Sequence, residues 1–206
     1  MDDRVRITAI VGSYRKGGII DQTVDEMLAS AREEGAETFK IYLVDTRLEF
    51  CTNCRLCTEQ KGAARGVCPI ADEMADLLDQ IEASDAIILA SPVNFATVTA
   101  LMKRFIERLV CYAYWPWGMM APKVRTRLTP RRAVLVASSA APALIARLAT
   151  SVVGLLKKAA GLLGAKTVGV IFIGLAAREK QPDPGARIRK KARLLGKKLA
   201  SAGVRL

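Results

Sequence analysis

The sequence predicts an α/β protein built on a doubly wound parallel sheet of five strands. Short apolar runs rich in β-branched residues alternate along the chain with stretches in which apolar residues recur every three or four positions. Such alternation of strands and helices requires right-handed crossovers, which give a parallel sheet with helices on both faces. The 206 residues suffice for one domain of this kind, and half of them are hydrophobic.

Each predicted element follows from its own pattern. The five runs predicted as strands are Val5–Val11, Phe39–Val44, Ala86–Ala90, Ala133–Ala137 and Thr167–Ile173. Apolar stripes at helical spacing predict helices at Val24–Ala31, Met74–Ile81, Leu101–Leu109, 142–163 as one long apolar helix, and Ile188–Leu199. We find no internal repeat and no linker, so residues 1–206 are predicted to form a single domain. Within it lie a cysteine-rich loop at 45–70 and an irregular aromatic excursion at 111–130.

The charge is divided unevenly along the chain, which has a net charge of +12. Residues 1–120 have a net charge of −5 and residues 121–206 a net charge of +17. The basic half is interpreted as a solvated face or as a surface for an acidic partner, an anionic membrane or nucleic acid. No nucleic-acid-binding module accompanies it, so nucleic acid is the weakest of these interpretations. The terminal basic residues are Arg189, Lys190, Lys191, Arg193, Lys197 and Lys198.

Targeting signals and histidine are both missing from the sequence. Charged residues follow Met1 directly, so no signal peptide is expected and the protein is predicted to be cytoplasmic. The most apolar stretch, Ala133–Leu156, is interrupted by polar residues and reads as a strand and a helix, so no membrane span is expected. The absence of histidine excludes histidine-based triads, histidine metal ligands and imidazole bases.

The loop after the first strand reads GSYRKGG, from Gly12 to Gly18. In doubly wound sheets of order 2-1-3-4-5, ligands bind at the carboxyl ends of the strands, between the first and third strands. Glycines and a helix N-terminus favour binding of a phosphate, and Ser13, Arg15 and Lys16 supply further donors. The loop is neither a GxGxxG nor a Walker A sequence. Its alternative interpretation is an ordinary glycine-rich turn.

The loop after the third strand reads SPVNFAT, from Ser91 to Thr97. Pro92 stiffens this loop, and Asn94 and Phe95 offer a hydrogen-bonding group and an aromatic face. These features suit a flat heteroaromatic ring whose edge is hydrogen-bonded and whose face is packed. The alternative is a plain connection that binds no ligand.

Four cysteines lie in the pattern Cys51-x2-Cys54-x2-Cys57-x10-Cys68-Pro69. The first three can surround one face of an iron–sulfur cluster, and the fourth completes the ligand set. Four thiolates without histidine also suit structural zinc, and free or disulfide-forming thiols are a third alternative. Cys111 lies apart and is interpreted as a packing residue. Arg55 and Lys61 in the loop are expected to be solvated.

Three segments in order resemble the NADPH-dependent FMN reductase superfamily, and more narrowly its iron–sulfur flavoprotein branch. They are GSYRKGG, CTNCRLCTEQKGAARGVCPIADEM and DAIILASPVNFATVTALMKRFIER, within residues 5–110. The resemblance implies a flavodoxin-like fold, bound FMN, a 4Fe–4S cluster on the four cysteines, and a homodimer or homotetramer. The FMN contacts it implies are Ser13, Arg15, Gly17, Gly18, Pro92, Val93, Asn94, Phe95, Ser138, Ser139 and Ala140. The chain departs from the family at Ile19-Ile20, where Asn-Thr is usual, and at Asn94, where Tyr is frequent.

The sequence therefore predicts an FMN-dependent NAD(P)H oxidoreductase or electron-transfer flavoprotein that uses a 4Fe–4S cluster to pass electrons to an acidic carrier such as ferredoxin. The alternative is a non-catalytic binding or redox-sensing module with a zinc or thiol loop. The aromatic run Tyr112–Trp117 would cover the flavin, line a subunit interface or pack locally. Arg104, Glu107 and Arg108 are predicted to face solvent or a neighbouring subunit, without a catalytic role.

Overall fold

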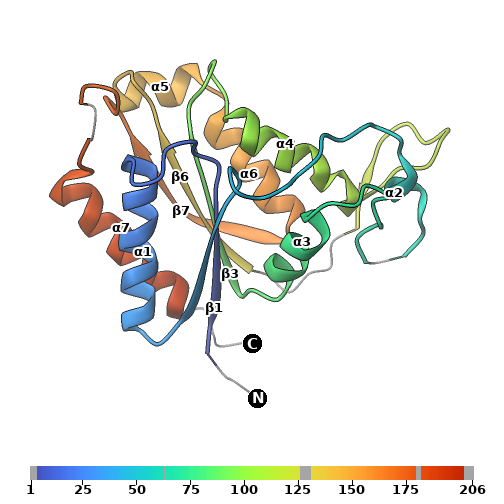
Figure 1. Ribbon diagram of the computed structural model, residues 1–206, viewed down its shortest axis with the longest axis horizontal. Helices are drawn as coiled ribbons and strands as arrows, with labels where there is room; N and C mark the ends of the chain where they lie inside the picture. The colour runs from blue at the N-terminus through green and yellow to red at the C-terminus, as the bar shows by residue number, and fades with distance from the viewer. Residues whose placement is uncertain (1–3, 63, 126–130, 180–181, 202–206) are drawn as a thin grey trace.

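The computed structural model describes residues 4–62, 64–125, 131–179 and 182–201. At its centre lies a parallel sheet with the strand order β2-β1-β3-β6-β7 (Figure 1). The strands are β1 (Arg6–Val11), β2 (Glu37–Tyr42), β3 (Ala86–Pro92), β6 (Arg131–Ser138) and β7 (Ala165–Ile173). This order confirms the predicted doubly wound sheet, and each predicted strand overlaps an observed one.

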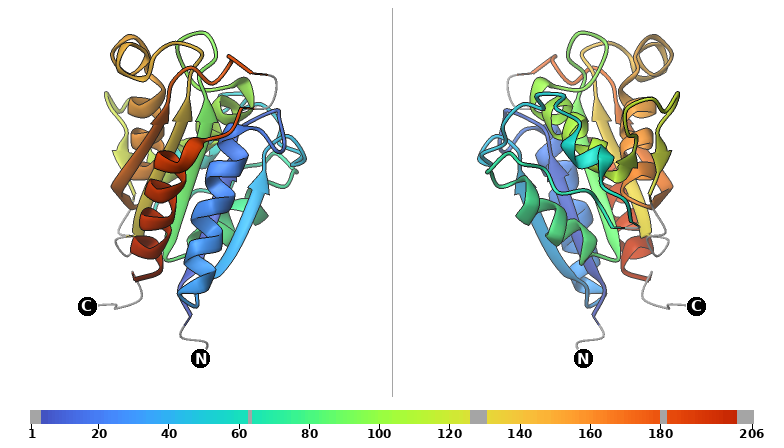
Figure 2. Two further views of the ribbon diagram at one scale, coloured as in Figure 1. Left: turned by 90° about the vertical axis from the view of Figure 1, so that its left-hand side faces the viewer. Right: turned by 90° about the vertical axis from the view of Figure 1, so that its right-hand side faces the viewer.

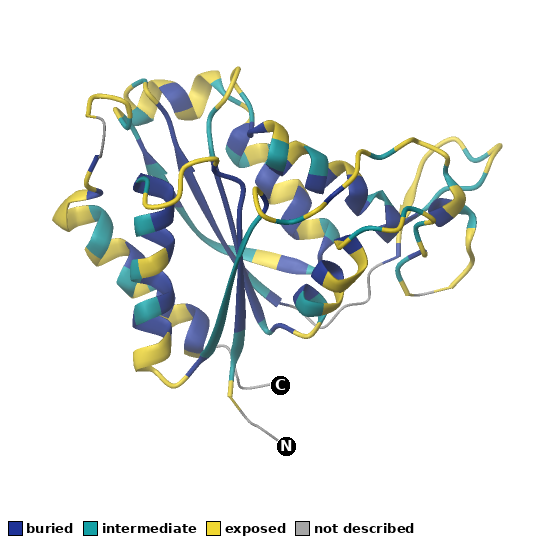
Figure 3. Cartoon of the chain, viewed as in Figure 1, coloured by how far each residue is buried: buried dark blue, intermediate teal, exposed yellow. Residues whose placement is uncertain are grey.

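Helices cover both faces of this sheet (Figure 2). The face packed by α1 and α7 has its own buried cluster, and the cluster on the opposite face includes residues of α3, α4 and α6. The longer helices are α1 (Ile19–Glu33), α3 (Met74–Glu82), α4 (Ala100–Arg108), α6 (Val152–Leu162) and α7 (Gly185–Ala200). Because both faces are covered, β3 reads as a continuous apolar run, and Ile87, Ile88 and Leu89 are fully buried (Figure 3).

The apolar stretch at 142–163, predicted as one helix, forms two: α5 (Ala143–Ala149) and α6. Thr150 between them adopts an extended backbone, with φ −127° and ψ 151°. The N–H of Ser151 donates to the carbonyl of Ala96, 2.8 Å away, in the loop after β3. This long-range bond takes the place of a helical one and ends α5. Within the described residues, no helix has the length and apolar character needed to cross a membrane.

The predicted irregular excursion begins with regular structure. The short helix η1 (Leu109–Tyr112) leads into β4 (Ala113–Tyr114), which pairs with β5 (Lys123–Val124) as an antiparallel hairpin. Residues 126–130 of the excursion lie outside the described residues. The hairpin lies beside the cysteine-rich loop, where Trp115 N–H donates to Thr58 O at 2.8 Å and the short helix α2 (Leu56–Glu59) begins (Figure 1).

The basic terminal helix α7 packs against α1 of the same chain. A Cβ added at Gly196 would lie 2.2 Å from the carbonyl oxygen of Met27, so the helices approach as closely as a glycine permits. Ion pairs join the two helices: Arg189–Glu26, Arg193–Glu33 and Lys197–Glu34. Part of the basic surface is therefore paired with acidic residues of the same chain.

Candidate functional site

The three loops predicted to hold the flavin lie together at the carboxyl edge of the sheet. Gly12 N–H donates to Ala90 O at 2.8 Å, which joins the ends of β1 and β3. Val93 N–H donates to Ser138 O at 2.7 Å, which joins the loops after β3 and β6. The three loops thus form one continuous surface where the strand order reverses, the place at which such sheets bind ligands.

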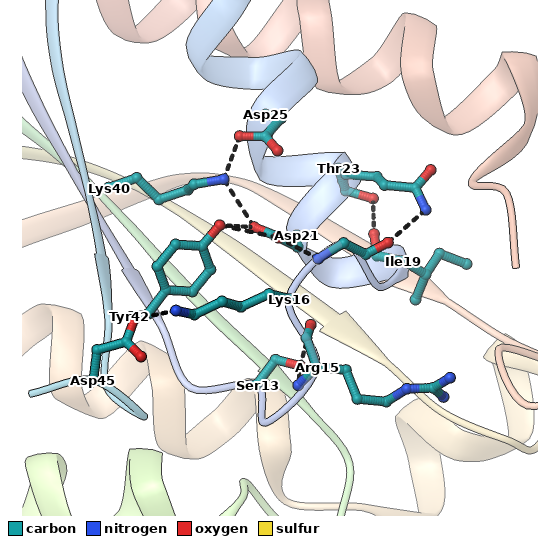
Figure 4. A network of polar contacts seen from close by, with 12 residues as sticks. Ser13, Arg15, Lys16, Ile19, Asp21, Thr23, Asp25, Lys40, Tyr42 and Asp45 are labelled. Atoms are coloured by element: carbon teal, nitrogen blue, oxygen red, sulfur yellow. Dashed lines mark hydrogen bonds and ion pairs between the residues drawn. The ribbon is translucent and has the colours of Figure 1, made fainter. Parts of the chain in front are cut away.

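The loop after β1 has the geometry of an anion-binding turn. Ser13 is buried, and its hydroxyl oxygen accepts the N–H of Arg15 at 3.1 Å. Gly17 adopts φ +71°, a conformation that favours glycine, and Gly18 immediately precedes α1. Arg15 and Lys16 extend to opposite sides of the loop (Figure 4). The first N–H groups of α1 lack partners within the helix, so they are available to a phosphate.

A buried carboxylate beneath this loop fixes its shape (Figure 4). Asp21 accepts hydrogen bonds from Gly17 N–H at 2.6 Å, from the Tyr42 hydroxyl at 2.8 Å and from Lys40 Nζ at 2.9 Å. Burial raises the pKa of the Asp21 carboxyl, but these hydrogen bonds outweigh it and leave that pKa below its ordinary value. Asp21 therefore remains ionised at neutral pH and holds Gly17 in place.

Ile19 and Ile20 supply no polar side-chain group to the phosphate loop. Both side chains are buried in the core between the sheet and α1. The polar contacts to a phosphate would therefore come from Ser13, Arg15 and the backbone N–H groups. This donor set fits the monophosphate of FMN, with fewer side-chain contacts than the family usually has.

The loop after β3 holds two consecutive residues in the left-handed region, Phe95 with φ +43° and Ala96 with φ +61°. Such non-glycine conformations cost about 1–3 kcal/mol each and are concentrated at functional sites. Asn94 and Thr97 close the turn through mutual backbone hydrogen bonds of 2.9 Å. The turn leaves the Phe95 side chain fully exposed, where it can pack against a planar ring.

The loop after β6 offers a ligand mainly its backbone. Ser138 and Ser139 are both buried, and the Ser139 hydroxyl oxygen accepts the N–H of Ala141 at 3.1 Å. Ala140 is exposed at the tip. The predicted flavin residues thus share one edge of the sheet, but the hydroxyls of the third loop are directed inward.

The four cysteines of the motif line one cavity of about 210 Å³, together with Arg108 and Trp115. Burial raises the pKa of the Cys57 thiol, and the neighbouring Cys68, Cys51 and Cys54 raise it further. All five cysteines of the chain are free thiols in the structure.

The path of the chain brings Cys68 back to the other three cysteines. Asn53 and Arg55 adopt φ +54° and +64°, which turn the loop between the first three cysteines. Gly66 then packs directly on Cys57: an added Cβ would lie 1.8 Å from the Cys57 carbonyl oxygen. Gly66 N–H also donates to Cys111 O at 2.8 Å. The contact of Gly66 with Cys57 thus brings Cys68, two residues further on, to the cavity that the other three cysteines line.

Arg55, predicted to be solvated, and Arg108, predicted to face solvent or a neighbouring subunit, both line the cysteine cavity instead. Arg55 lies between two indoles, 4.4 Å from the ring centroid of Trp115 and 4.0 Å from that of Trp117. Arg108 is buried and donates to Asp72 and to the sulfur of Cys68. Burial raises the pKa of Asp72, but its hydrogen bonds to Arg108 and to backbone N–H groups lower it overall. The predicted surface positions of Lys61 and Glu107 are confirmed.

The described residues contain no preformed site for a metal ion. Across the described residues, no three cysteine, aspartate or glutamate side chains converge closely enough to hold one metal ion. The four cysteines share one cavity, and four thiolates are a ligand set for an iron–sulfur cluster or for zinc. Cys111 lies outside this cavity, and burial raises the pKa of its thiol to about 12, as a packing residue requires.

Helix α4 connects the two sites. Its N-cap residue Thr99 borders the flavin loops, and its last residue Arg108 borders the cysteine cavity. Nine helical residues at about 1.5 Å each place the two ends about 13 Å apart. The sequence predicted no role for Thr99 and only a surface position for Arg108, although threonine just before a helical stripe is a recognised N-cap signal.

The strand order and the loops at its reversal define a flavodoxin-like α/β protein. A model of the NADPH-dependent FMN reductase family matches residues 5–175, and the chain belongs to this family of oxidoreductases.

Curated relatives match about half of the chain. An iron-sulfur flavoprotein of Archaeoglobus fulgidus is 37% identical over 112 residues, which are 54% of this chain and 49% of the relative. An iron-sulfur flavoprotein of Methanocaldococcus jannaschii is 38% identical over 104 residues, 50% of this chain and 51% of the relative. The chain spans about half the length of these relatives.

Solved structures share the fold at low identity. An FMN-dependent NADH-azoreductase from Bacillus anthracis in complex with FMN has a TM-score of 0.71 at 13% identity, with 95% of this chain and 99% of that chain covered. An archaeal flavodoxin has a TM-score of 0.56 at 10% identity, with 97% and 99% covered.

Proposed function

We propose that the protein is an FMN-dependent oxidoreductase that takes electrons from NAD(P)H and passes them onward through a 4Fe–4S cluster. The observation that carries this proposal is the connection of the two sites by α4, from Thr99 at the flavin loops to Arg108 at the cysteine cavity. FMN, when bound, supplies the exchange between two-electron and one-electron chemistry. The chain's own residues bind, orient and shield the two groups.

In this proposal the flavin contacts come from the three loops at the sheet edge. Ser13, Arg15 and the N–H groups around Gly17 and Gly18 would hold the phosphate. The Pro92–Phe95 segment would hold the ring, with Phe95 against its face and Asn94 at its edge. Ser138, Ser139 and Ala140 would contribute backbone groups on the remaining side.

Cys51, Cys54, Cys57 and Cys68 would ligate the cluster. Their shared cavity, their mutual influence on the Cys57 pKa and the strained turns at Asn53 and Arg55 support this assignment. The alternative is a non-catalytic binding or redox-sensing module with a zinc or thiol loop on the same four cysteines.

The experiment follows electrons from one site to the other. Protein prepared anaerobically with FMN, iron and sulfide is mixed rapidly with NADH or NADPH, and absorbance is recorded in the flavin and cluster bands. We expect the flavin band to bleach first and the cluster band to follow. In Cys57→Ala the second phase should disappear, whereas in the matched control Cys111→Ala it should persist. A cluster band that never responds to the reduced flavin would refute the proposal.

A further inference from the structure

Arg108 is a buried cation placed between a carboxylate and a cysteine sulfur. Its Nη1 donates to Asp72 Oδ2 at 2.6 Å, and its Nη2 donates to Asp72 Oδ1 at 3.1 Å. The same Nη2 donates to Cys68 Sγ at 3.5 Å, and Nη1 also donates to Glu49 O at 2.9 Å. The Arg108 side chain is 2% exposed and that of Asp72 1% exposed. This is an ion pair within the protein, not a surface contact.

The charges of this pair are oriented relative to the cysteine cavity. Arg108 lines the cavity and contacts Cys68, whereas Asp72 does not line it. A group in the cavity therefore lies nearer to the positive charge than to the negative one. Interactions between buried charges are weakly screened, so the difference in distance has a larger effect than it would at the surface.

A cluster ligated by four thiolates is a net anion, and it becomes more negative when it accepts an electron. A cation or a hydrogen bond at a ligating sulfur stabilises the more negative form, which raises the reduction potential. The guanidinium of Arg108 supplies both at Cys68. Asp72 fixes its orientation by two-point pairing, which a lysine would not form.

We propose that Arg108 is a positioning residue that raises the reduction potential of the cluster through its contact with Cys68, with Asp72 setting the strength of this effect. The inference rests on the proposed function, since it requires the cluster. It differs from a purely structural role, in which the pair would only brace α4 against the carbonyl of Glu49. If the role were purely structural, replacing Asp72 or Arg108 would affect stability and iron content but would not shift the reduction potential in opposite directions.

The test is a spectroelectrochemical titration of the holoprotein, with iron content measured for every variant. Asp72→Asn removes the negative charge and should raise the midpoint potential of the cluster. The double variant R108Q/D72N keeps the local net charge, leaves no unpaired buried charge and should lower the potential below that of the wild type. Arg108→Lys keeps the charge, and its midpoint potential should lie between those of the wild type and R108Q/D72N.

Matched controls remove single charges at the surface of the same helices. Lys103→Gln lies on α4, and Asp76→Asn lies in the first turn of α3; both should leave the potential unchanged. If the double variant does not retain iron, the single variants D72N and R108K still test the proposal. It requires the midpoint potential of the cluster to rise in D72N and to fall in R108K. Unchanged potentials in iron-loaded D72N and R108K would overturn the inference while leaving the proposed function intact. A wild type that takes up no iron would instead overturn the proposed function, and the inference with it.

Discussion

The hydroxyl of Thr99 donates a 2.6 Å hydrogen bond to the carbonyl oxygen of Gly12. The Thr99 hydroxyl oxygen in turn accepts the N–H of Met102 at 3.2 Å and so caps α4. Thr99 is fully buried, and its N–H donates to the hydroxyl of Ser91 at 3.1 Å. One side chain therefore fixes the start of α4 and the relative position of two flavin loops.

Replacement of Thr99 by valine should loosen these loops. Loss of the cap and of the buried hydrogen bond should lower the free energy of unfolding by about 1–3 kcal/mol. We expect the Kd for FMN, measured by quenching of flavin fluorescence, to rise about tenfold, equivalent to about 1.4 kcal/mol. Thr38→Val, at the amino end of β2, removes a hydroxyl that contacts Arg32 and serves as the control. Equal FMN affinity in both variants would show that Thr99 does not position the site.

The phosphate loop is tested by comparing two flavins. In the double variant S13A/R15A, the Kd for FMN should rise at least about a hundredfold, because each donor to a charged group contributes about 1.5–3 kcal/mol. Riboflavin lacks the phosphate, so its affinity should remain at the wild-type value. Arg32→Ala, at the far end of α1, is the control. A parallel loss of FMN and riboflavin affinity would place the defect in the fold of the loop and not in phosphate recognition.

Asp21 makes the stability of the protein depend on acid pH. Its pKa in the folded protein lies below the ordinary value of about 3.9, so the unfolded chain binds the proton more readily. The contribution of Asp21 is therefore complete above about pH 4 and is lost as the pH falls through its folded pKa. Asp21→Asn should be less stable at pH 7 and should lose less stability on acidification, as measured by urea unfolding from pH 7 to pH 2. The exposed control Asp76→Asn should keep the steep loss of stability on acidification. The same steep loss in D21N would contradict this role.

Gly66 is required for the approach of the loop to Cys57. In Gly66→Ala the new Cβ would collide with the Cys57 carbonyl oxygen, so the backbone must move and displace Cys68. We expect iron uptake on reconstitution to fall well below that of the wild type, while FMN affinity is retained. Gly161→Ala in α6, where an added Cβ meets nothing within 4 Å, is the control and should stabilise the helix by up to about 1 kcal/mol. Full iron uptake in G66A would show that this contact is dispensable.

The basic helix α7 retains exposed lysines that can steer an acidic electron carrier. Lys190 and Lys191 are exposed, whereas Lys197 pairs with Glu34. Reversal of both lysines in K190E/K191E should slow electron transfer to an acidic ferredoxin. The wild-type rate should fall with added salt, since exposed charges are screened over about 8 Å at physiological ionic strength. K157E/K158E makes the same charge change on α6 at the opposite face. Equal electron-transfer rates in the two variants would show that the basic surface is only a solvated face.

Local patterns in the sequence were sufficient to predict the sheet and the loops that lie together at its carboxyl edge. The parallel sheet was predicted from the alternation of strands and helices. The roles of the loops at Gly12 and Ser91 were predicted from their glycine, proline and polar residues. The burial of Arg108 could not be predicted, because it depends on Asp72 and Cys68, 36 and 40 residues away in the chain. Similarly, the break at Thr150 depends on a bond between Ser151 and Ala96. Tertiary contacts override local propensity at these positions.

The most direct test of the central claim is the composition of the protein after anaerobic preparation with iron, sulfide and FMN. Iron, acid-labile sulfide, zinc and flavin are quantified per chain, and the visible spectrum is recorded. The proposed function predicts about four irons, about four sulfides and one FMN per chain, with broad cluster absorption beneath the flavin bands. The same preparation of the variant C51A/C54A/C57A/C68A should retain FMN and lose the iron. A colourless wild-type protein that contains one zinc and no flavin would contradict the account.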